Sequence, residues 1–293
     1  MDTFILIAVT GIGLGALYFL VACGLTLIYG LMGVLNFAHG IFLTVGAFFG
    51  LWAANTFFKN GSTIDYLLSA LVGGIGAGLF ALLVEQLVIT RLYDRHIDQA
   101  LVTVGVALVV GAMLSGWFTN DMRMLPSPAW FMDAVQVGNA NIPKDRFMYI
   151  AVAAVLLILF IVILRFTRIG LIIRAGVENR QMVSALGINV RLAFSMVFFL
   201  GGLAAGIGGV LVASYQGGVT PLMAGSWLIY GFIVVVIGGM GSIGGSALAA
   251  LMIGVIKQFA NYYVPGLGDF VIVFLLAVVL LIRPQGLLGK VSA

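Results

Sequence analysis

The polar residues that could do chemistry in this sequence interrupt long apolar stretches, and the first interruption covers residues 30–40. Asn36 and His39 lie between an apolar run that ends near Leu35 and another that resumes at Ile41. Hydrogen-bonding side chains at membrane depth are costly and usually mark a solute pathway or an internal contact. A broken helix also exposes backbone groups that can hold a solute. We therefore consider Asn36 and His39 candidates for a solute path; a tight turn at the cytoplasmic surface is the competing interpretation.

A second interruption covers residues 238–245, which read Gly-Gly-Met-Gly-Ser-Ile-Gly-Gly. Residues 30–50 are weakly similar to this pattern. Corresponding breaks in the two halves of a chain point to a transport site. The solute-path candidates here are Gly238, Gly239, Gly241 and Ser242. A phosphate loop would need the Lys and Ser/Thr of a Walker sequence after a strand, and a serine hydrolase would need Gly-x-Ser-x-Gly. Neither pattern occurs in this segment.

Few residues of this chain could act in enzymatic catalysis or bind a metal. The single cysteine, Cys23, excludes an internal disulfide and a multi-thiolate metal site, and the only histidines are His39 and His96. Glu85 and Lys257 are charges within apolar stretches. We expect them at opposite membrane depths and predict no pair between them, so an ion-coupling carboxylate has weak support. We expect no catalytic residue, no metal and no cofactor.

The elements that position these residues must lie in lipid. Of the 293 residues, 62% are hydrophobic and 8% are charged, and the mean hydropathy is +1.21. A soluble domain carries about a quarter charged residues, so this composition cannot build a water-facing surface. No basic cluster precedes the first apolar run, as it would in a signal peptide, so we expect that run to be a retained membrane helix.

Long apolar stretches predict an all-α, polytopic integral membrane protein. A membrane helix needs about 20 apolar residues. The stretches lie at about 4–30, 40–58, 66–90, 100–118, 147–165, 192–215, 226–240, 246–264 and 268–283. Allowing for broken helices at the two interruptions, we predict about eight to ten transmembrane helices. They form one transmembrane domain over residues 1–293, without a separate soluble domain.

Basic residues predict the orientation, because cytoplasmic loops of membrane proteins carry an excess of lysine and arginine. Nine of the fourteen basic residues fall in three segments that lie on one side by this count of spans, 91–98, 165–191 and 283–293. We predict that these segments are cytoplasmic, and that the N-terminus is outside if the first 58 residues make two passes. The longest outer loop, 119–146, caps a vestibule, docks a soluble partner or simply connects two helices.

The predicted cytoplasmic segment 170–191 has the pattern of a short amphipathic helix that Gly187 ends. The apolar positions are Ile172, Ile173, Val177, Met182, Val183, Leu186 and Ile188, and the polar ones are Arg174, Glu178, Asn179, Arg180 and Gln181. Such a helix docks into a soluble partner or lies in the membrane interface.

Pairs of glycines four residues apart predict close helix packing. Gly74 and Gly78 lie on one face of one predicted span, and Gly202 and Gly206 on one face of another. Small residues at this spacing let a neighbouring helix approach closely. Gly116, near a span end, is the comparison position at which we expect no close neighbour.

Several motifs together resemble the permeases of branched-chain amino acid ABC importers, a family with relatives that carry urea and amides. The motifs are Gly24-Leu25-Thr26-Leu27-Ile28-Tyr29-Gly30, Asn36-Phe37-Ala38-His39-Gly40, Ala185-Leu186-Gly187-Ile188-Asn189-Val190, the Gly-rich span Gly201 to Gly209, the segment 238–245, and Arg283-Pro284-Gln285-Gly286-Leu287-Leu288-Gly289. The resemblance covers nearly the whole chain, and the Asn-Phe-Ala-His-Gly stretch and the tail are its most specific parts.

The resemblance implies that segment 170–191 is the cytoplasmic coupling loop that contacts ATPase subunits. The general importer loop carries Glu-Ala-Ala followed by Gly; Gln181, Met182 and Val183 stand in place of the triplet, while Gly187 is kept. The residues implied to couple the chain to the ATPase are Glu178, Arg180, Gln181, Ser184 and Gly187. The implied partners are a homologous second permease, two ATPases, an external solute-binding protein and the lipid bilayer of the bacterial inner membrane, with no nucleic acid.

These observations favour a permease subunit without enzymatic activity, in an ATP-driven importer of branched-chain or other amino acids. A urea or amide importer of the same family is the alternative. An ion-coupled secondary transporter would need a membrane-embedded acid or Na⁺ site, and only Glu85 offers one. A passive channel has no need of a coupling loop, and an intramembrane hydrolase is the least supported class.

Overall fold

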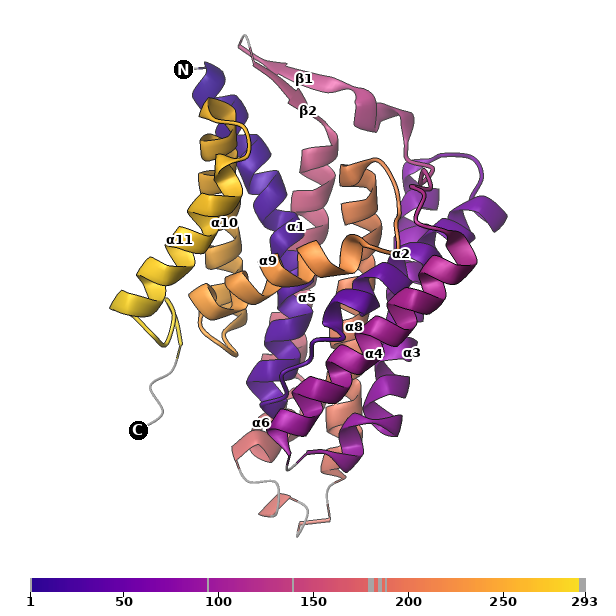
Figure 1. Ribbon diagram of the computed structural model, residues 1–293, viewed down its shortest axis with the longest axis vertical. Helices are drawn as coiled ribbons and strands as arrows, with labels where there is room; N and C mark the ends of the chain where they lie inside the picture. Colours follow the sequence, from indigo (N-terminus) through magenta and orange to yellow (C-terminus); the bar gives the residue numbers. More distant parts are fainter. Residues whose placement is uncertain are drawn as a thin grey trace.

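The computed structural model describes residues 2–93, 95–138, 140–178, 182–183, 186–187 and 189–289. It is an elongated helical bundle with one small hairpin (Figure 1). The helices are α1 (Asp2–Met32), α2 (His39–Thr56), α3 (Thr63–Leu87), η1 (Ile89–Arg91), α4 (His96–Phe118), η2 (Ala129–Met132), α5 (Asp145–Phe166), α6 (Arg168–Glu178), α8 (Val190–Gln216), α9 (Met223–Gly238), α10 (Ile243–Tyr263) and α11 (Leu267–Ile282).

Each of the nine predicted apolar stretches forms a helix in the described part of the chain, with ends that differ by a few residues. Six of these helices, α1, α3, α4, α5, α8 and α10, are long and apolar enough to cross a membrane, whereas α9 and α11 are shorter apolar helices. The prediction of a helical membrane protein is therefore confirmed in its general form.

The loop 119–146 departs from the all-α prediction, because it contains a short antiparallel hairpin. Strand β1 (Ala134–Val137) pairs with β2 (Ala140–Pro143), and Val135 lies opposite Ile142. Strands of four residues are too short for their period of two to stand out from the surrounding loop. The described chain thus combines a helical bundle with this hairpin.

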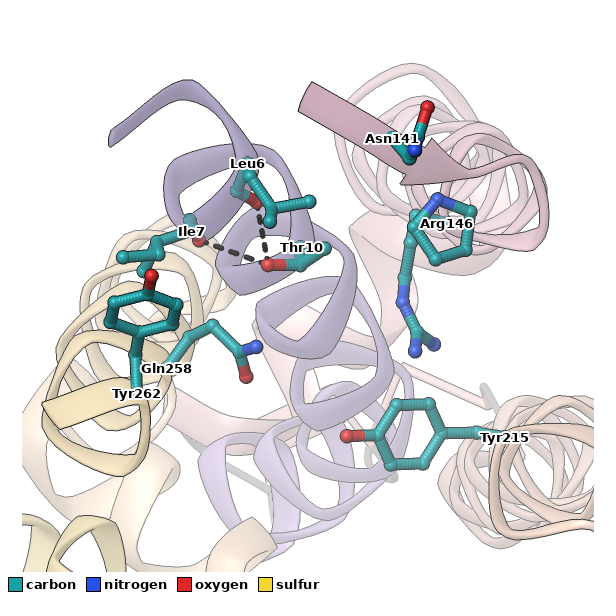
Figure 2. Close-up of a pocket in the computed structure, with 9 residues that line it drawn as sticks. Leu6, Ile7, Thr10, Asn141, Arg146, Tyr215, Gln258 and Tyr262 are labelled. Atoms are coloured by element: carbon teal, nitrogen blue, oxygen red, sulfur yellow. Dashed lines mark hydrogen bonds between the residues drawn. The ribbon is translucent and has the colours of Figure 1, made fainter. Parts of the chain in front are cut away.

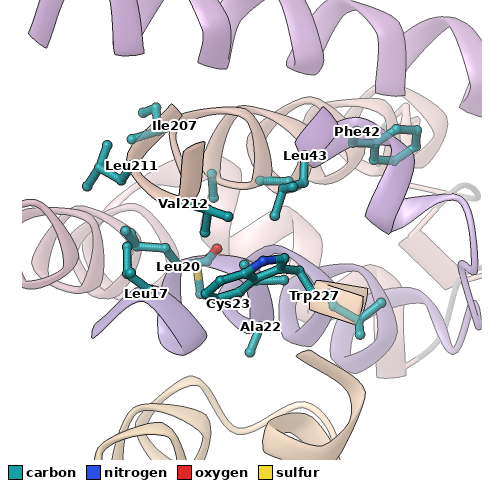
Figure 3. Packing of buried hydrophobic residues seen from close by; sticks show 14 of the residues in the cluster. Leu17, Leu20, Ala22, Cys23, Phe42, Leu43, Ile207, Leu211, Val212 and Trp227 are labelled. Carbon is teal, nitrogen blue, oxygen red and sulfur yellow. The ribbon is translucent and has the colours of Figure 1, made fainter. Parts of the chain in front are cut away.

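Helices α1 and α8 form the centre of the bundle, and α4 is the most exposed of the long helices. Apolar side chains from four helices meet there: Leu17 and Cys23 of α1, Leu43 of α2, Val212 of α8 and Trp227 of α9 (Figure 3). Outward-facing apolar residues of α4, such as Leu108, which is 69% exposed, require lipid or another protein to cover them.

The predicted glycine pairs lie where α3 and α8 approach each other most closely. A Cβ on Gly206 would lie 2.6 Å from the carbonyl oxygen of Gly73, and a Cβ on Gly202 would lie 2.7 Å from that of Ala77. A Cβ on Gly116 would meet nothing within 4 Å. The prediction of close packing is confirmed, and the two pairs belong to the same interface, which the sequence did not predict.

The bundle has two distinct ends. The hairpin and the N-terminus lie at one end, which we call the hairpin end, and α6 with the connection between α3 and α4 lies at the other, which we call the α6 end (Figure 1). The predicted cytoplasmic segments 91–98 and 165–191 therefore share one end of the molecule. Their cytoplasmic location stays a prediction.

Candidate functional site

The first interruption is a non-helical segment, residues 33–38, between α1 and α2. Asn36 is fully buried, and its Oδ1 accepts a hydrogen bond of 3.0 Å from the backbone N–H of Ala38. The backbone N–H of Phe37 donates to Oγ1 of Thr103 on α4 at 3.1 Å. Asn36 thus satisfies a backbone donor at the start of α2, and Thr103 satisfies another across a helix interface.

His39 joins α2 to the middle of α1. Its side chain is fully buried, and Nε2 lies 3.0 Å from the carbonyl oxygen of Val21. A carbonyl oxygen only accepts, so Nε2 carries the proton in this contact. Nδ1 of His39 and Nδ2 of Asn36 are buried without a partner among the described residues. Asn36 and His39 therefore make internal contacts, while Gly33 and Leu35 of the same segment are exposed. A role in the solute path stays a prediction.

We expect Asn36→Leu to reduce solute uptake severalfold while leaving the protein in the membrane. Leucine cannot accept the N–H of Ala38, and an unsatisfied buried donor costs about 1–3 kcal/mol at the point where α2 begins. Uptake and membrane abundance are measured in the same cells. Asn55→Leu, at an exposed position near the end of α2, is the matched control. Full uptake by the double variant Asn36→Leu, His39→Leu would show that neither polar group is needed.

The second interruption is a tight turn between α9 and α10. Gly239 and Gly241 have φ of +98° and +90°, a region that residues with a Cβ rarely adopt. The side chain of Ser242 accepts a hydrogen bond of 3.1 Å from the N–H of Gly245 and so caps α10. These glycines and this serine therefore have a structural role in the turn.

The chain after α11 folds back onto the same turn. The N–H groups of Leu287 and Leu288 donate to the carbonyl oxygens of Ile237 and Gly238 at 2.8 and 3.1 Å. These carbonyls belong to the last turn of α9, where no intrahelical donor is available. The tail thereby caps a short helix, a role that the sequence motif alone did not indicate.

The first interruption contacts both the second interruption and helix α9. Gly30, near the end of α1, packs directly on Gly241, and Oγ1 of Thr26 lies 2.7 Å from Oγ of Ser246. The non-helical part, residues 33–38, packs on α9, where the rings of Phe37 and Phe232 have centroids 5.1 Å apart. The two groups of candidate residues are therefore connected directly, through Gly30 and Gly241, and also through helix α9.

The predicted coupling segment is partly described. Helix α6 covers Arg168–Glu178, and Val183 packs with Val190 and Phe194 of α8. Gly187 is exposed, with φ +78°. The side chain of Glu178 and the whole of Arg180, Gln181 and Ser184 lie outside the described residues.

Glu85 and Lys257 have separate partners, which confirms that they do not pair. The buried Glu85 carboxylate accepts hydrogen bonds from Tyr93 at 2.5 Å and Ser195 at 2.7 Å, and so links the end of α3 to the first turns of α8. Lys257 forms an ion pair of 2.6 Å with Asp269. None of these three partners follows from the spacing of residues in the sequence.

A cavity of about 250 Å³ opens at the hairpin end, where α1, β2, α5, α8 and α10 meet (Figure 2). Its lining includes Arg146, which the sequence places only in the outer loop. The lining residues are Leu6, Ile7, Thr10, Asn141, Pro143, Arg146, Tyr215, Gln258 and Tyr262. Arg146 forms an ion pair of 3.2 Å with Asp145, and the guanidinium donors that this pair leaves free suit a small solute that carries an anionic group.

Comparison with known proteins agrees with the family resemblance of the sequence motifs. A family model described as "Branched-chain amino acid transport system / permease component" matches residues 7–280. The chain is 28% identical to the high-affinity branched-chain amino acid transport system permease protein LivH of Salmonella typhimurium, over 96% of this chain and 94% of that protein. It is also 28% identical to BraD of Pseudomonas aeruginosa, with the same coverage, and 27% identical to LivM of Escherichia coli, over 93% of this chain and 68% of that one.

Proposed function

This chain belongs to the branched-chain amino acid transport system permease family, and we propose that it is the membrane-spanning subunit of an ATP-driven importer for branched-chain or other amino acids. The family match over residues 7–280, nearly the whole helical bundle, carries this proposal. The chain itself would have no enzymatic activity, and partner subunits would hydrolyse ATP.

The proposed assembly contains a homologous second permease, two ATPases and an external solute-binding protein in the bacterial inner membrane. Two relatives support a second permease, because LivH and LivM of Escherichia coli are both named permease proteins of a high-affinity branched-chain amino acid transport system. We further propose that α2, α9 and α11 lie in the membrane with the six long helices, within the range of about eight to ten embedded helices.

The arrangement of the helices supports a mechanism in which the α6 end transmits movements of the ATPases to the helical bundle. Segment 170–191 would contact the ATPases, and α8 begins directly after that contact, at Val190. The hydrogen bond between Ser195 and Glu85 would pass a displacement of α8 to α3. Nucleotide would shift the bundle between outward-open and inward-open states only through its different affinity for the two states.

Two measurements test this proposal together. We expect the tagged chain to copurify with ATPase subunits and a second permease, and the reconstituted complex with its binding protein to take up leucine only with ATP. Uptake that needs an ion gradient and no ATP would favour a secondary transporter. ATP-driven uptake of amides without leucine would favour the amide branch of the family.

The predicted orientation is tested by cysteine accessibility. In a Cys23-free background, a cysteine at Arg95 should resist an impermeant thiol reagent added outside intact cells, because the basic segments are predicted to be cytoplasmic. A cysteine at Val137, in the exposed hairpin at the opposite end of the bundle, should react readily. The reverse pattern would invert the orientation.

A further inference from the structure

The cavity at the hairpin end has an arginine in an enclosed setting. The side chain of Arg146 is 18% exposed, and its guanidinium carbon lies 4.5 Å from the centre of the Tyr215 ring. Gly13 makes room for it, since a Cβ there would lie 2.8 Å from Cδ of Arg146. Packing therefore holds the guanidinium in one place with little freedom to move into bulk water.

Most of the hydrogen-bonding capacity of Arg146 is unused. Its side chain has one described hydrogen-bonding partner, Asp145, with 3.2 Å between Nη1 and Oδ2, besides its contacts with the rings of Tyr149 and Tyr215. A guanidinium has five N–H donors in a planar fork, which matches a carboxylate through two parallel hydrogen bonds. The remaining donors border the cavity, and within the described residues no acceptor occupies them.

The rest of the lining complements an amino acid and not an anion alone. Tyr215 and Gln258 also line the cavity, and Figure 2 shows Arg146 and Tyr215 on one side of α1 and Gln258 on the other. Both uncharged groups carry oxygens that can accept hydrogen bonds from an ammonium group. Leu6 and Ile7 supply an apolar wall for an aliphatic side chain.

We propose that this cavity binds a small aliphatic α-amino acid, with its carboxylate on Arg146 and its ammonium group on the oxygens of Tyr215 and Gln258. The inference rests on the proposed import function, which places the hairpin end outside the cell. The cavity is then a binding site for the solute on the permease itself, separate from the binding protein. Arg146 selects solutes that carry a carboxylate, and the apolar wall favours aliphatic side chains.

The test measures binding of radiolabelled leucine to the assembled importer without its binding protein, in nanodiscs of phosphatidylcholine. We expect saturable binding, with leucinamide as a weak competitor because it lacks the carboxylate. Arg146→Gln should weaken leucine binding about ten- to hundredfold, the usual effect of losing a charge-assisted pair of hydrogen bonds. Arg146→Lys should restore part of the affinity, because it keeps the charge and loses the fork.

The controls separate recognition from a structural role. Arg123→Gln removes an outer-loop arginine whose described side-chain contacts are with Phe118, and it should bind leucine as the unsubstituted complex does. In Arg146→Gln, the preference for leucine over leucinamide should fall toward one, whereas a loss of folded protein would reduce binding sites and leave the preference unchanged. An unchanged preference would overturn the proposal.

The anion could instead be a lipid phosphate, so the bound lipid is measured as well. Leucine binding should persist in nanodiscs that contain phosphatidylglycerol. The proposal would be overturned in favour of a lipid site if leucine failed to bind in phosphatidylcholine while phosphatidylglycerol copurified with the unsubstituted chain and not with Arg146→Gln.

Failure of this site is distinguishable from failure of the import function. If the Arg146→Gln importer takes up leucine with ATP and binds leucine as tightly as the unsubstituted importer, the import function stands and this site does not. If the unsubstituted importer transports no amino acid at all, the import function itself is wrong.

Discussion

Gly206→Leu should prevent assembly of the membrane domain, with at least about a tenfold loss of folded protein in the membrane. Three helices meet at this position. A Cβ on Gly206 would lie 2.6 Å from the carbonyl oxygen of Gly73 on α3 and 2.9 Å from the Cα of Gly74, and a Cβ on Gly46 of α2 would overlap the Cα of Gly206. The obstructing atoms are backbone and the Cβ of Ala77, which also lies 2.6 Å away, so no rotamer change makes room.

The size of this effect follows from how membrane helices associate. Without a hydrophobic drive between helices in lipid, van der Waals packing holds α2, α3 and α8 together. Inserting methylenes into a packed core costs about 1–3 kcal/mol even where side chains can shift. A leucine here must separate whole helices and also lose their mutual contacts, so the cost exceeds that range.

The measurement is the amount of monodisperse protein after membrane extraction and size-exclusion chromatography. Gly116→Leu and Gly105→Leu on α4 are matched controls, because a Cβ at either glycine meets nothing within 4 Å. They should yield about as much protein as the unsubstituted chain, and Gly206→Ala should fall between. Equal yields from Gly206→Leu and Gly116→Leu would mean that α3 and α8 do not pack as described.

Gly187→Pro should uncouple transport from ATP hydrolysis, with solute-stimulated hydrolysis and uptake falling in parallel by at least about tenfold. Gly187 has φ +78°, and proline fixes φ near −65°. The backbone of the proposed coupling segment must therefore adopt a different conformation at this residue. Membrane insertion should persist, because α5 and α8 on either side keep their apolar length.

A graded series separates backbone shape from steric effects. A Cβ at Gly187 would meet nothing within 4 Å, so Gly187→Ala adds only the cost of a left-handed conformation, about 1 kcal/mol, and should retain most activity. Gly61→Pro is the matched control at the opposite end of the bundle, since Gly61 has φ +65° and equally open surroundings. Full coupling in Gly187→Pro would exclude a rigid coupling role for this segment.

Two further readouts locate the contact with the ATPase. Charge reversal at Glu178 and Arg180 together should lower hydrolysis and uptake in the same way. A cysteine at Ser184 should crosslink to an ATPase subunit in the assembled complex. Crosslinks that form only from the loop 91–98, and from no position between 176 and 188, would move the coupling site to the connection between α3 and α4.

The sequence by itself was enough to predict that this protein lies in lipid, where its helices are and which family it resembles. A charged fraction of 8% excludes a water-facing surface. Helix positions could be predicted locally, because each apolar run indicates by its own length and composition that it is buried in lipid or protein. The hairpin escaped prediction for a related reason, since strands of four residues are stable only through pairing with each other.

Only the tertiary structure decided which polar groups meet. Glu85 contacts Ser195, Lys257 contacts Asp269, and the residues after α11 cap α9. The cavity around Arg146 likewise draws its walls from five elements spread from residue 6 to residue 262. Hydrophobic periodicity predicts which face of a helix is buried, but it does not predict which neighbouring helix that face contacts. The contact between Glu85 and Ser195, for example, depends on how closely α3 and α8 approach, and the glycines between these helices set that distance.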